Sequence, residues 1–293
     1  MENKIIIILA GVCFVFVVLS VLFIALYATK DDDEDGTTKF EKQEESIISS
    51  SGEKIYGILY LPKKKNKNTV ILCHGFGGTH EDMVPYAEYL AKYGYVTYVF
   101  DFRGGSPQSK SEGSTTKMTP LTEKNDLSDV YEYLIKQDYV KAGKVYIIGN
   151  SQGGFVSSMY AAENKDKVAG LLLLFPALVI PDNARAQYSN KNSIPDTIDF
   201  MGMTISKEYY LSIYDMNAYT YLKGYDKQVI ILHGIEDSIV PYSSSVTACI
   251  NYGTTCRLIL YEGGEHGLNE EVPRKKSLQD TLHFFNDLID GVF

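Results

Sequence analysis

The sequence is short of basic residues, and this limits its possible partners. It carries 28 lysines and arginines against 37 aspartates and glutamates, and its formal net charge at pH 7 is −9. Proteins that bind nucleic acids present a concentrated basic face. The composition therefore argues against a nucleic-acid partner. The 293 residues also contain no Asn-x-Ser/Thr acceptor for N-glycosylation.

Cysteine is scarce as well, with four residues in the chain. Their spacing fits no zinc motif and no pair of histidines accompanies them, so we expect no metal site. Cys73 lies in an apolar run and is expected to be a small buried hydrophobic residue. Cys249 and Cys256 flank a glycine-containing loop. The sequence leaves open whether they form a disulfide in an oxidising compartment or remain two thiols.

A long uncharged run, residues 5–28, lies near the amino terminus. As a helix it would span about 36 Å, more than the hydrocarbon core of about 30 Å. A cleavable signal peptide has a shorter apolar region, of about 7–15 residues, and ends at a small-x-small site. Leu26-Tyr27-Ala28 supplies no such site. We therefore predict a single-pass transmembrane signal anchor, with a cleaved signal peptide as the alternative.

The segments beside this run set the predicted orientation. Residues 1–4 are a short tail, and residues 29–43, with the acidic run 31–35, are predicted to form a solvated stalk. Lys4 and Lys30 nearly cancel in the positive-inside comparison. Because the tail is so short, we predict that the amino terminus lies inside. The catalytic domain is then expected on the extracellular or lumenal side of the membrane.

Residues 44–293 are predicted to form one domain in which strands and helices alternate. Two strands, 44–49 and 55–61, are expected to form a hairpin. The later predicted strands are 69–73, 95–100, 144–148, 168–175, 228–232 and 256–261, and the later predicted helices are 83–93, 121–136, 152–163, 246–251 and 277–289. This order, with strands apolar on both faces, predicts an α/β fold with a mostly parallel sheet flanked by helices.

One interval, about 177–227, interrupts this alternation and shows no clear strand. A stretch of this length inside a compact domain is usually functional. We predict an inserted cap over the site, with an apolar and aromatic substrate pocket formed by Phe200, Met203, Tyr209 and Tyr210. The alternative is a surface excursion whose aromatic side chains only pack on the main core.

The segment Gly149-Asn150-Ser151-Gln152-Gly153-Gly154 follows an apolar strand and precedes a predicted helix. This is the setting of a G-x-S-x-G nucleophile elbow, in which a sharp strand-to-helix turn exposes one serine hydroxyl. The five-residue pattern alone is common in a chain with 24 glycines. The prediction that Ser151 is a nucleophile therefore depends on the partners found elsewhere in the chain.

A serine nucleophile needs a base and a carboxylate that orients the base. His266 lies in a glycine-rich turn after the strand 256–261, and it is the predicted base. Asp237 follows the strand 228–232 and is preferred over its neighbour Glu236 as the carboxylate. Of the other histidines, His233 is expected to be structural, and positions 74, 80 and 283 are not assigned to catalysis. His80 and His283 are expected at the surface or on a helix face.

The oxyanion of an acyl-transfer reaction needs two preorganised N–H donors. We predict the backbone N–H of Gln152, directly after the nucleophile, and that of Phe76, in the glycine-rich loop after the strand 69–73. That loop lacks the lysine of a phosphate-binding G-x-x-x-x-G-K-[ST] loop, which argues against a nucleotide site. For Arg103, the sequence favours a structural salt bridge over contact with an acidic substrate.

Together these motifs resemble the α/β-hydrolase superfamily. Within it the chain looks most like the cinnamoyl (feruloyl) esterase-like serine hydrolases, which are similar to hydrolases of the prolyl-oligopeptidase and aminopeptidase types. The residues that carry the resemblance are His74-Gly75-Phe76, Asp101-Phe102-Arg103-Gly104, Gly149-x-Ser151-Gln152-Gly153-Gly154, His233-Gly234-x-x-Asp237 and Glu265-His266-Gly267. The chain order Ser151, Asp237, His266 is that of the superfamily.

The resemblance implies a serine esterase without cofactor or metal, acting on a small ester or acyl substrate. The chain departs from the family's pattern at two places. Asn150 stands where many members have histidine, which concerns packing, and Gly105-Ser106 replaces the usual His-Gly, which concerns the acyl pocket. A serine peptidase of the prolyl-oligopeptidase or aminopeptidase type and a hydrolase of lipid esters are the alternatives. A non-catalytic adhesion module on the same fold is a remoter one.

Overall fold

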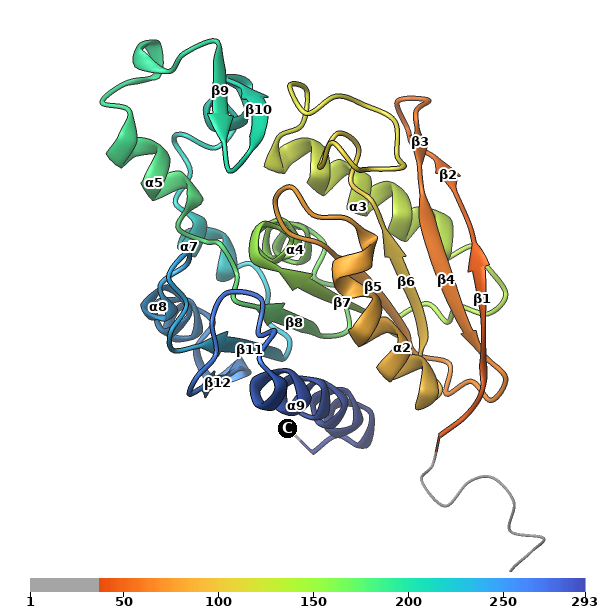
Figure 1. The fold of residues 1–293 in the computed structure, drawn as a ribbon. Helices are drawn as coiled ribbons and strands as arrows, with labels where there is room; N and C mark the ends of the chain where they lie inside the picture. The colour runs from red at the N-terminus through yellow and green to blue at the C-terminus, as the bar shows by residue number, and fades with distance from the viewer. Residues whose placement is uncertain (1–36, 293) are drawn as a thin grey trace, which may run out of the picture. The chain divides into compact units, whose positions relative to one another are not determined.

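The computed structural model describes residues 37–292, which include a compact unit that begins at Lys39 (Figure 1). Its main strands are β1 (Phe40–Glu44), β4 (Gly57–Pro62), β5 (Thr69–Cys73), β6 (Val96–Phe100), β7 (Val145–Asn150), β8 (Leu171–Leu174), β11 (Val229–Gly234) and β12 (Cys256–Tyr261). They form one sheet in the order β1-β4-β6-β5-β7-β8-β11-β12. The pairs from β6 to β12 are parallel, whereas β4 is antiparallel to β1 and to β6. The predicted α/β-hydrolase sheet is therefore present.

The amino-terminal hairpin is more divided than predicted. Besides β1 and β4, which pair with each other, β2 (Ile47–Ile48) and β3 (Lys54–Ile55) form a small antiparallel pair. β1 begins at Phe40, inside the segment that the sequence assigns to the stalk. The Phe40 ring lies 5.7 Å from the ring of Tyr60, centroid to centroid, and this contact fixes the first strand on the sheet.

Helices cover both faces of the sheet. The helices α2 (Val84–Lys92) and α9 (Glu271–Asp290) contribute to the core on one face. The helices α3 (Pro120–Leu134), α4 (Ser151–Glu163) and α8 (Tyr242–Tyr252) contribute to the core on the other. Alternate side chains of β5 enter opposite cores: Ile71 and Cys73 join the second group, and Val70 and Leu72 the first. All four are completely buried, which explains the unbroken apolar run in the sequence.

The interval predicted to be a cap does contain strands. Its elements are α5 (Ile180–Gln187), η2 (Lys191–Ser193), β9 (Thr197–Phe200), β10 (Met203–Ser206), α6 (Glu208–Leu211) and α7 (Ala218–Leu222). β9 and β10 form a hairpin around Met201 and Gly202, both with positive φ. Figure 1 shows this hairpin between α5 and α3. The sequence did not predict this hairpin because each of its strands has only four residues, and β9 is largely exposed.

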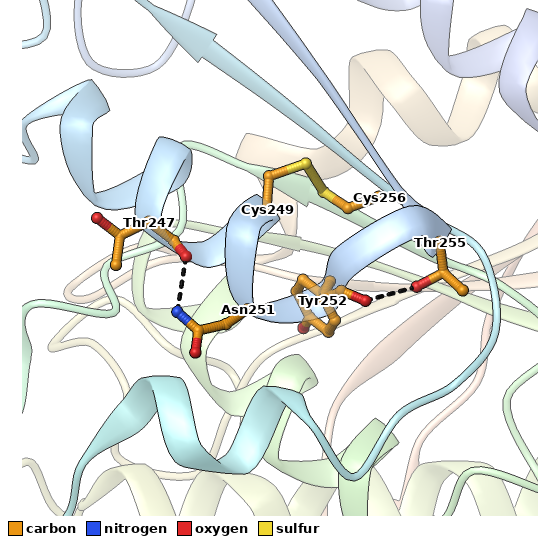
Figure 2. Close-up of a disulfide and its surroundings, with 6 residues drawn as sticks. All are labelled: Thr247, Cys249, Asn251, Tyr252, Thr255 and Cys256. Carbon is orange, nitrogen blue, oxygen red and sulfur yellow. Dashed lines mark hydrogen bonds between the residues drawn. A yellow bond between two sulfur atoms is a disulfide. The ribbon is translucent and has the colours of Figure 1, made fainter.

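Cys249 and Cys256 form a disulfide, which decides a question that the sequence left open (Figure 2). Cys249 belongs to α8 and Cys256 begins β12, and their Cα atoms are 5.3 Å apart. The short helix η3 (Gly253–Thr255) lies between them. The bond thus joins the end of a helix to the strand that follows it.

The predicted transmembrane segment, residues 5–28, lies outside the described residues. Among residues 37–292, no helix has both the length and the hydropathy needed to cross a bilayer.

Candidate active site

Ser151 lies at the turn between β7 and α4, as the nucleophile elbow predicts. Its φ is 48°, in the left-handed region that non-glycine residues rarely adopt. Close packing explains the glycines around it. A Cβ atom at Gly149 would lie 2.4 Å from the Gly153 carbonyl oxygen, and one at Gly153 would lie 2.3 Å from the His74 carbonyl oxygen. The turn can therefore form only because these positions have no side chain.

His266 reaches Ser151 from the loop between β12 and α9. Its Nε2 atom lies 3.1 Å from the Ser151 Oγ atom, although 115 residues separate the two in the sequence. The Phe175 ring packs edge-on against the imidazole, with a centroid distance of 4.7 Å. The imidazole is therefore held on one side by packing, while its Nε2 faces the hydroxyl of the elbow.

Asp237 lies on the far side of His266, after β11. Its Oδ2 atom is 2.7 Å from His266 Nδ1, and its Oδ1 atom accepts the N–H groups of Ile239 and Val240 at 2.9 and 2.8 Å. Because a carboxylate faces Nδ1, this nitrogen carries the proton, and Nε2 keeps its lone pair toward Ser151. The structure thus brings together all three residues of the predicted Ser-His-Asp set.

The charge of Asp237 is strongly stabilised although its side chain is buried. Burial by itself raises the pKa of this carboxyl group. Hydrogen bonds from His233 and His266 and from the Val240 N–H outweigh burial and hold the pKa well below its ordinary value. Asp237 is therefore a permanent negative charge beside the imidazole at neutral pH.

His233, which the sequence analysis treated as structural, is a direct partner of Asp237. Its side chain is completely buried, and its Nε2 atom lies 3.1 Å from Asp237 Oδ2 and 3.0 Å from the Val240 carbonyl oxygen. Both neighbours of Nε2 accept hydrogen bonds, so Nε2 donates, and Nδ1 faces the Ser245 hydroxyl at 2.7 Å. In the sequence, the feature that could have indicated this contact was the His233-Gly234-x-x-Asp237 spacing at the end of a strand.

The two predicted oxyanion donors lie on either side of Ser151. Gln152 is in the first turn of α4, where N–H groups have no partner within the helix. Phe76 follows Gly75, where a Cβ atom would lie 3.0 Å from Ser151 Cβ. Within residues 37–292, the N–H of Phe76 forms no hydrogen bond with another protein group. Both donors are thus available near the nucleophile.

The completely buried His74 fixes the loop that carries Phe76. Its Nε2 atom accepts the Phe102 N–H at 3.0 Å, and its Nδ1 atom donates to the Gly75 carbonyl oxygen at 2.7 Å. Burial lowers the pKa of His74, which agrees with a neutral ring that both accepts and donates. This histidine therefore joins the loop after β5 to the loop after β6.

A cavity of about 450 Å³ opens at Ser151 and His266. Its apolar wall includes the side chains of Phe76, Phe175, Leu174, Met201 and Ile239. Three charged side chains, those of Glu81, Asp82 and Arg274, line it as well. The cavity therefore offers apolar surface close to the nucleophile together with charges of both signs.

None of the four residues predicted for the substrate pocket lines this cavity. Met203, Tyr209 and Tyr210 are at most 4% exposed and form the core of the cap, together with Met118, Ala184, Ile194 and Ile205. Phe200 is partly exposed and packs on Phe76, with ring centroids 5.1 Å apart. The cap residue on the cavity wall is Met201, which is 61% exposed at the tip of the β9–β10 hairpin. The aromatic composition did not indicate which side chains of this interval would face the cavity.

Two further predictions concern residues outside the cavity. Arg103 forms salt bridges with Asp126 and Glu53, in agreement with the structural alternative. His80, expected at the surface or on a helix face, is in a helix but only 4% exposed, and its Nδ1 atom lies 2.6 Å from Asp101 Oδ1. It is buried because it begins the short helix η1 (His80–Met83), which packs on β5 and β6.

Comparison with known proteins identifies the family. Residues 82–291 match the model of the prolyl oligopeptidase family, and the chain therefore belongs to this family. A solved structure of Est1E from Butyrivibrio proteoclasticus, with ferulic acid bound, is 28% identical. It superposes with a TM-score of 0.75 over 83% of this chain and 98% of that one.

Two curated enzymes are similar in sequence. The monoglyceride lipase of Saccharomyces cerevisiae is 24% identical over 232 residues, which are 63% of this chain and 73% of the lipase. The proline iminopeptidase of Saccharolobus solfataricus is 26% identical over 153 residues, 52% of this chain and 47% of that enzyme. The chain spans about a third of the length of several other relatives that it matches. The chain is a serine hydrolase of the α/β-hydrolase type, with esterase-like and lipase-like relatives.

Proposed function

We propose that the chain hydrolyses carboxylic esters through an acyl-enzyme, with Ser151, His266 and Asp237 as its catalytic triad. One observation carries this proposal: the unbroken series of hydrogen-bond distances from Ser151 Oγ to His266 Nε2 and from His266 Nδ1 to Asp237 Oδ2. A serine hydroxyl is a weak nucleophile unless a base removes its proton, and this arrangement provides such a base.

In the proposed reaction the Ser151 Oγ atom attacks the ester carbonyl carbon while its proton moves to His266 Nε2. The negative charge then lies on the former carbonyl oxygen, which accepts the N–H groups of Phe76 and Gln152. When the tetrahedral intermediate collapses, His266 gives its proton to the departing alkoxide and the acyl group remains on Ser151. Water, activated by the same imidazole, releases the acid and restores the free serine.

The cavity supports a small ester or acyl substrate. A volume of about 450 Å³ lies at the lower end of the range for small-molecule sites. The apolar side chains of Phe76, Phe175 and Ile239 suit an aromatic or short aliphatic acyl group, in line with ferulic acid bound to Est1E. The likeness to a yeast monoglyceride lipase makes lipid esters a second set of substrates to test.

A specific observation favours a peptidase as the second candidate. Glu81 and Asp82 place two carboxylates on the cavity wall, where they suit the free amino group of a peptide. The family match and the similarity to a proline iminopeptidase point to the same chemistry. Arg274 on the same wall weakens this candidate because it offsets part of the negative charge.

We also propose that residues 5–28 tether the enzyme to a membrane, with the catalytic domain on the extracellular or lumenal side. The length of the apolar run supports the tether. The disulfide between Cys249 and Cys256 supports an extracellular or lumenal catalytic domain, because disulfides persist in oxidising compartments.

The test compares the wild-type chain with Ser151→Ala. We expect the wild type to be labelled by a fluorophosphonate probe and to hydrolyse small aryl and alkyl esters, and both activities to disappear in Ser151→Ala. A folded wild-type protein that is neither labelled nor active would overturn the proposal. Aminoacyl amides turned over as fast as the matched esters would favour the peptidase instead.

A further inference from the structure

Tyr209, on α6 of the cap, contacts both residues that are proposed to bind the oxyanion. Its hydroxyl group lies 2.5 Å from the Gln152 Oε1 atom. Its ring packs edge-on against the Phe76 ring, with a centroid distance of 5.8 Å. Tyr209 itself is only 1% exposed, so neither contact competes with water. One side chain of the cap therefore touches the two segments that flank the nucleophile.

The side chain of Gln152 does not line the substrate cavity and lies in a buried polar cluster. It is 1% exposed, and its Nε2 atom donates to Glu123 Oε2 at 2.8 Å. Glu123 lies on α3 and is also 1% exposed. The amide of Gln152 is thus held from two directions, by the cap and by α3.

Burial acts on both titratable groups of this cluster, Glu123 and Tyr209. Burial raises the pKa of Glu123 well above its ordinary range, against the opposing effect of the hydrogen bond from Gln152. Burial likewise raises the pKa of Tyr209, whose hydroxyl therefore keeps its proton and donates. Gln152 thus joins Tyr209 and Glu123 through hydrogen bonds in a dry site, while the Glu123 Oε1 atom has no hydrogen-bond partner among the described residues.

We infer that Tyr209 is a positioning residue, through which the cap fixes the two N–H groups of the oxyanion hole. The inference rests on the proposed function, and it assigns the cap a role beyond enclosing the substrate. Tyr209 does not line the cavity wall formed by the described residues, so it acts through Gln152 and Phe76. Donors aimed at the oxyanion are effective only when they are held in place before charge develops.

A hydroxyl-deletion series tests this role in the full chain. Tyr209→Phe keeps the ring on Phe76 and removes the bond to Gln152. Tyr214→Phe is the matched control, because its hydroxyl donates at 2.7 Å to the Tyr188 carbonyl oxygen within the cap and has no link to Gln152. Gln152→Met keeps the backbone N–H but removes the amide that Tyr209 holds. The substrate is a small ester, with thermal unfolding measured for each variant.

We expect Tyr209→Phe to lower kcat by about 10- to 100-fold, the scale of a small misplacement of catalytic groups, with KM changed less than about twofold. Affinity for a trifluoromethyl ketone analogue of the ester should fall by the same factor. The ketone is attacked by Ser151 and carries its oxyanion in the same position. Tyr214→Phe should leave kcat, KM and analogue affinity within about twofold of the wild type, as a peripheral change does.

Gln152→Met should reproduce the loss, and the double variant with Tyr209→Phe should lose little more than either single variant. Three results would overturn the inference: a wild-type kcat in Tyr209→Phe, a rise in KM alone, or losses that multiply in the double variant. Gln152→Met supplies the answer if Tyr209→Phe does not fold. A wild-type chain without esterase activity would instead overturn the proposed function.

Discussion

His233 Nε2 and Asp237 Oδ2 are hydrogen-bonded at 3.1 Å, and the same Asp237 Oδ2 atom lies 2.7 Å from His266 Nδ1. One Asp237 oxygen therefore receives two imidazole N–H groups, while the other receives two backbone N–H groups. These four hydrogen bonds hold the carboxylate in one orientation. The rotation of Asp237, and with it the tautomer of His266, is fixed by the protein before any substrate binds.

Removing one of these supports should weaken catalysis without abolishing it. We expect His233→Asn to lower kcat by about 10-fold, because Asp237 keeps three of its four hydrogen bonds but loses one that restrains it. KM for small esters should stay close to the wild-type value, since His233 is buried away from the cavity. Steady-state kinetics on a neutral ester measures both constants. An unchanged kcat would show that the other three bonds suffice.

Asp237→Asn should have a much larger effect. An amide in place of the carboxylate favours the wrong His266 tautomer, and the loss of kcat should be about 10⁴-fold, as expected for this substitution in a Ser-His-Asp triad. Glu236→Gln, one position away, is the control and should keep its activity. Comparable losses in both variants would contradict the assignment of Asp237.

Glu123 should make the stability of the protein depend on pH. Its pKa is raised by burial, so the folded state holds a proton that the unfolded state releases above about pH 4.3. Stability from this group is present at low pH and falls as the pH rises toward the folded pKa, at up to about 1.4 kcal/mol per pH unit.

Glu123→Gln should remove this dependence. Urea unfolding at pH 5 and pH 8 should show the variant gaining stability relative to the wild type at the higher pH. Asp126, whose pKa burial raises to about 6, is present in both proteins, and the difference between them includes its charge interaction with Glu123. Stability curves that stay parallel across this range would mean that Glu123 is ionised in the folded protein.

The disulfide should stabilise the fold without affecting catalysis. It closes a short loop, with a sequence separation of 7, for which chain entropy predicts about 2.5 kcal/mol. Cys249→Ser combined with Cys256→Ser should lower the free energy of unfolding by about that amount. Because the bond lies at the opposite end of β12 from the His266 loop, kcat should be unchanged. Peptide mapping with and without reductant identifies the bond directly.

The apolar amino-terminal run can be tested by truncation. A chain that lacks residues 1–28 should appear in the soluble fraction and keep its ester hydrolysis, since the described compact unit begins at Lys39. The full chain should require detergent for release from membranes. Full-length protein recovered in the soluble fraction without detergent would contradict the tether.

The sequence correctly predicted those elements that depend on interactions between residues close together in the chain. The run Thr69–Cys73 is a strand at its predicted bounds, because five consecutive buried side chains can be read directly as a strand covered on both faces. The elbow glycines also followed from the sequence, since a strand-to-helix turn around an exposed serine leaves no room for side chains. Boundaries near the amino terminus were less accurate, because Phe40 is placed by a contact with a partner 20 residues away.

The cap shows where local reasoning fails. Tyr209, Tyr210 and Met203 were assigned to a substrate pocket on their composition alone, yet an aromatic side chain serves a core and a pocket equally well. Their direction depends on how a four-residue helix and a short hairpin pack against Met118 and Ala184. The position of Glu123 opposite Gln152 is likewise a property of how α3 packs beside α4.

The sequence alone determined the order of the main strands of the sheet and of the helices that flank it, the elbow around Ser151, and the residue types and chain order of a Ser-Asp-His set. These features depend on periodicity, turn chemistry and short spacings, which act within a few residues. Only the tertiary structure decided that His266 lies 3.1 Å from Ser151, that His233 shares the carboxylate of Asp237, and that Tyr209 holds Gln152. Such distances join residues far apart in the chain, and they are fixed by the packing of whole elements rather than by any local preference.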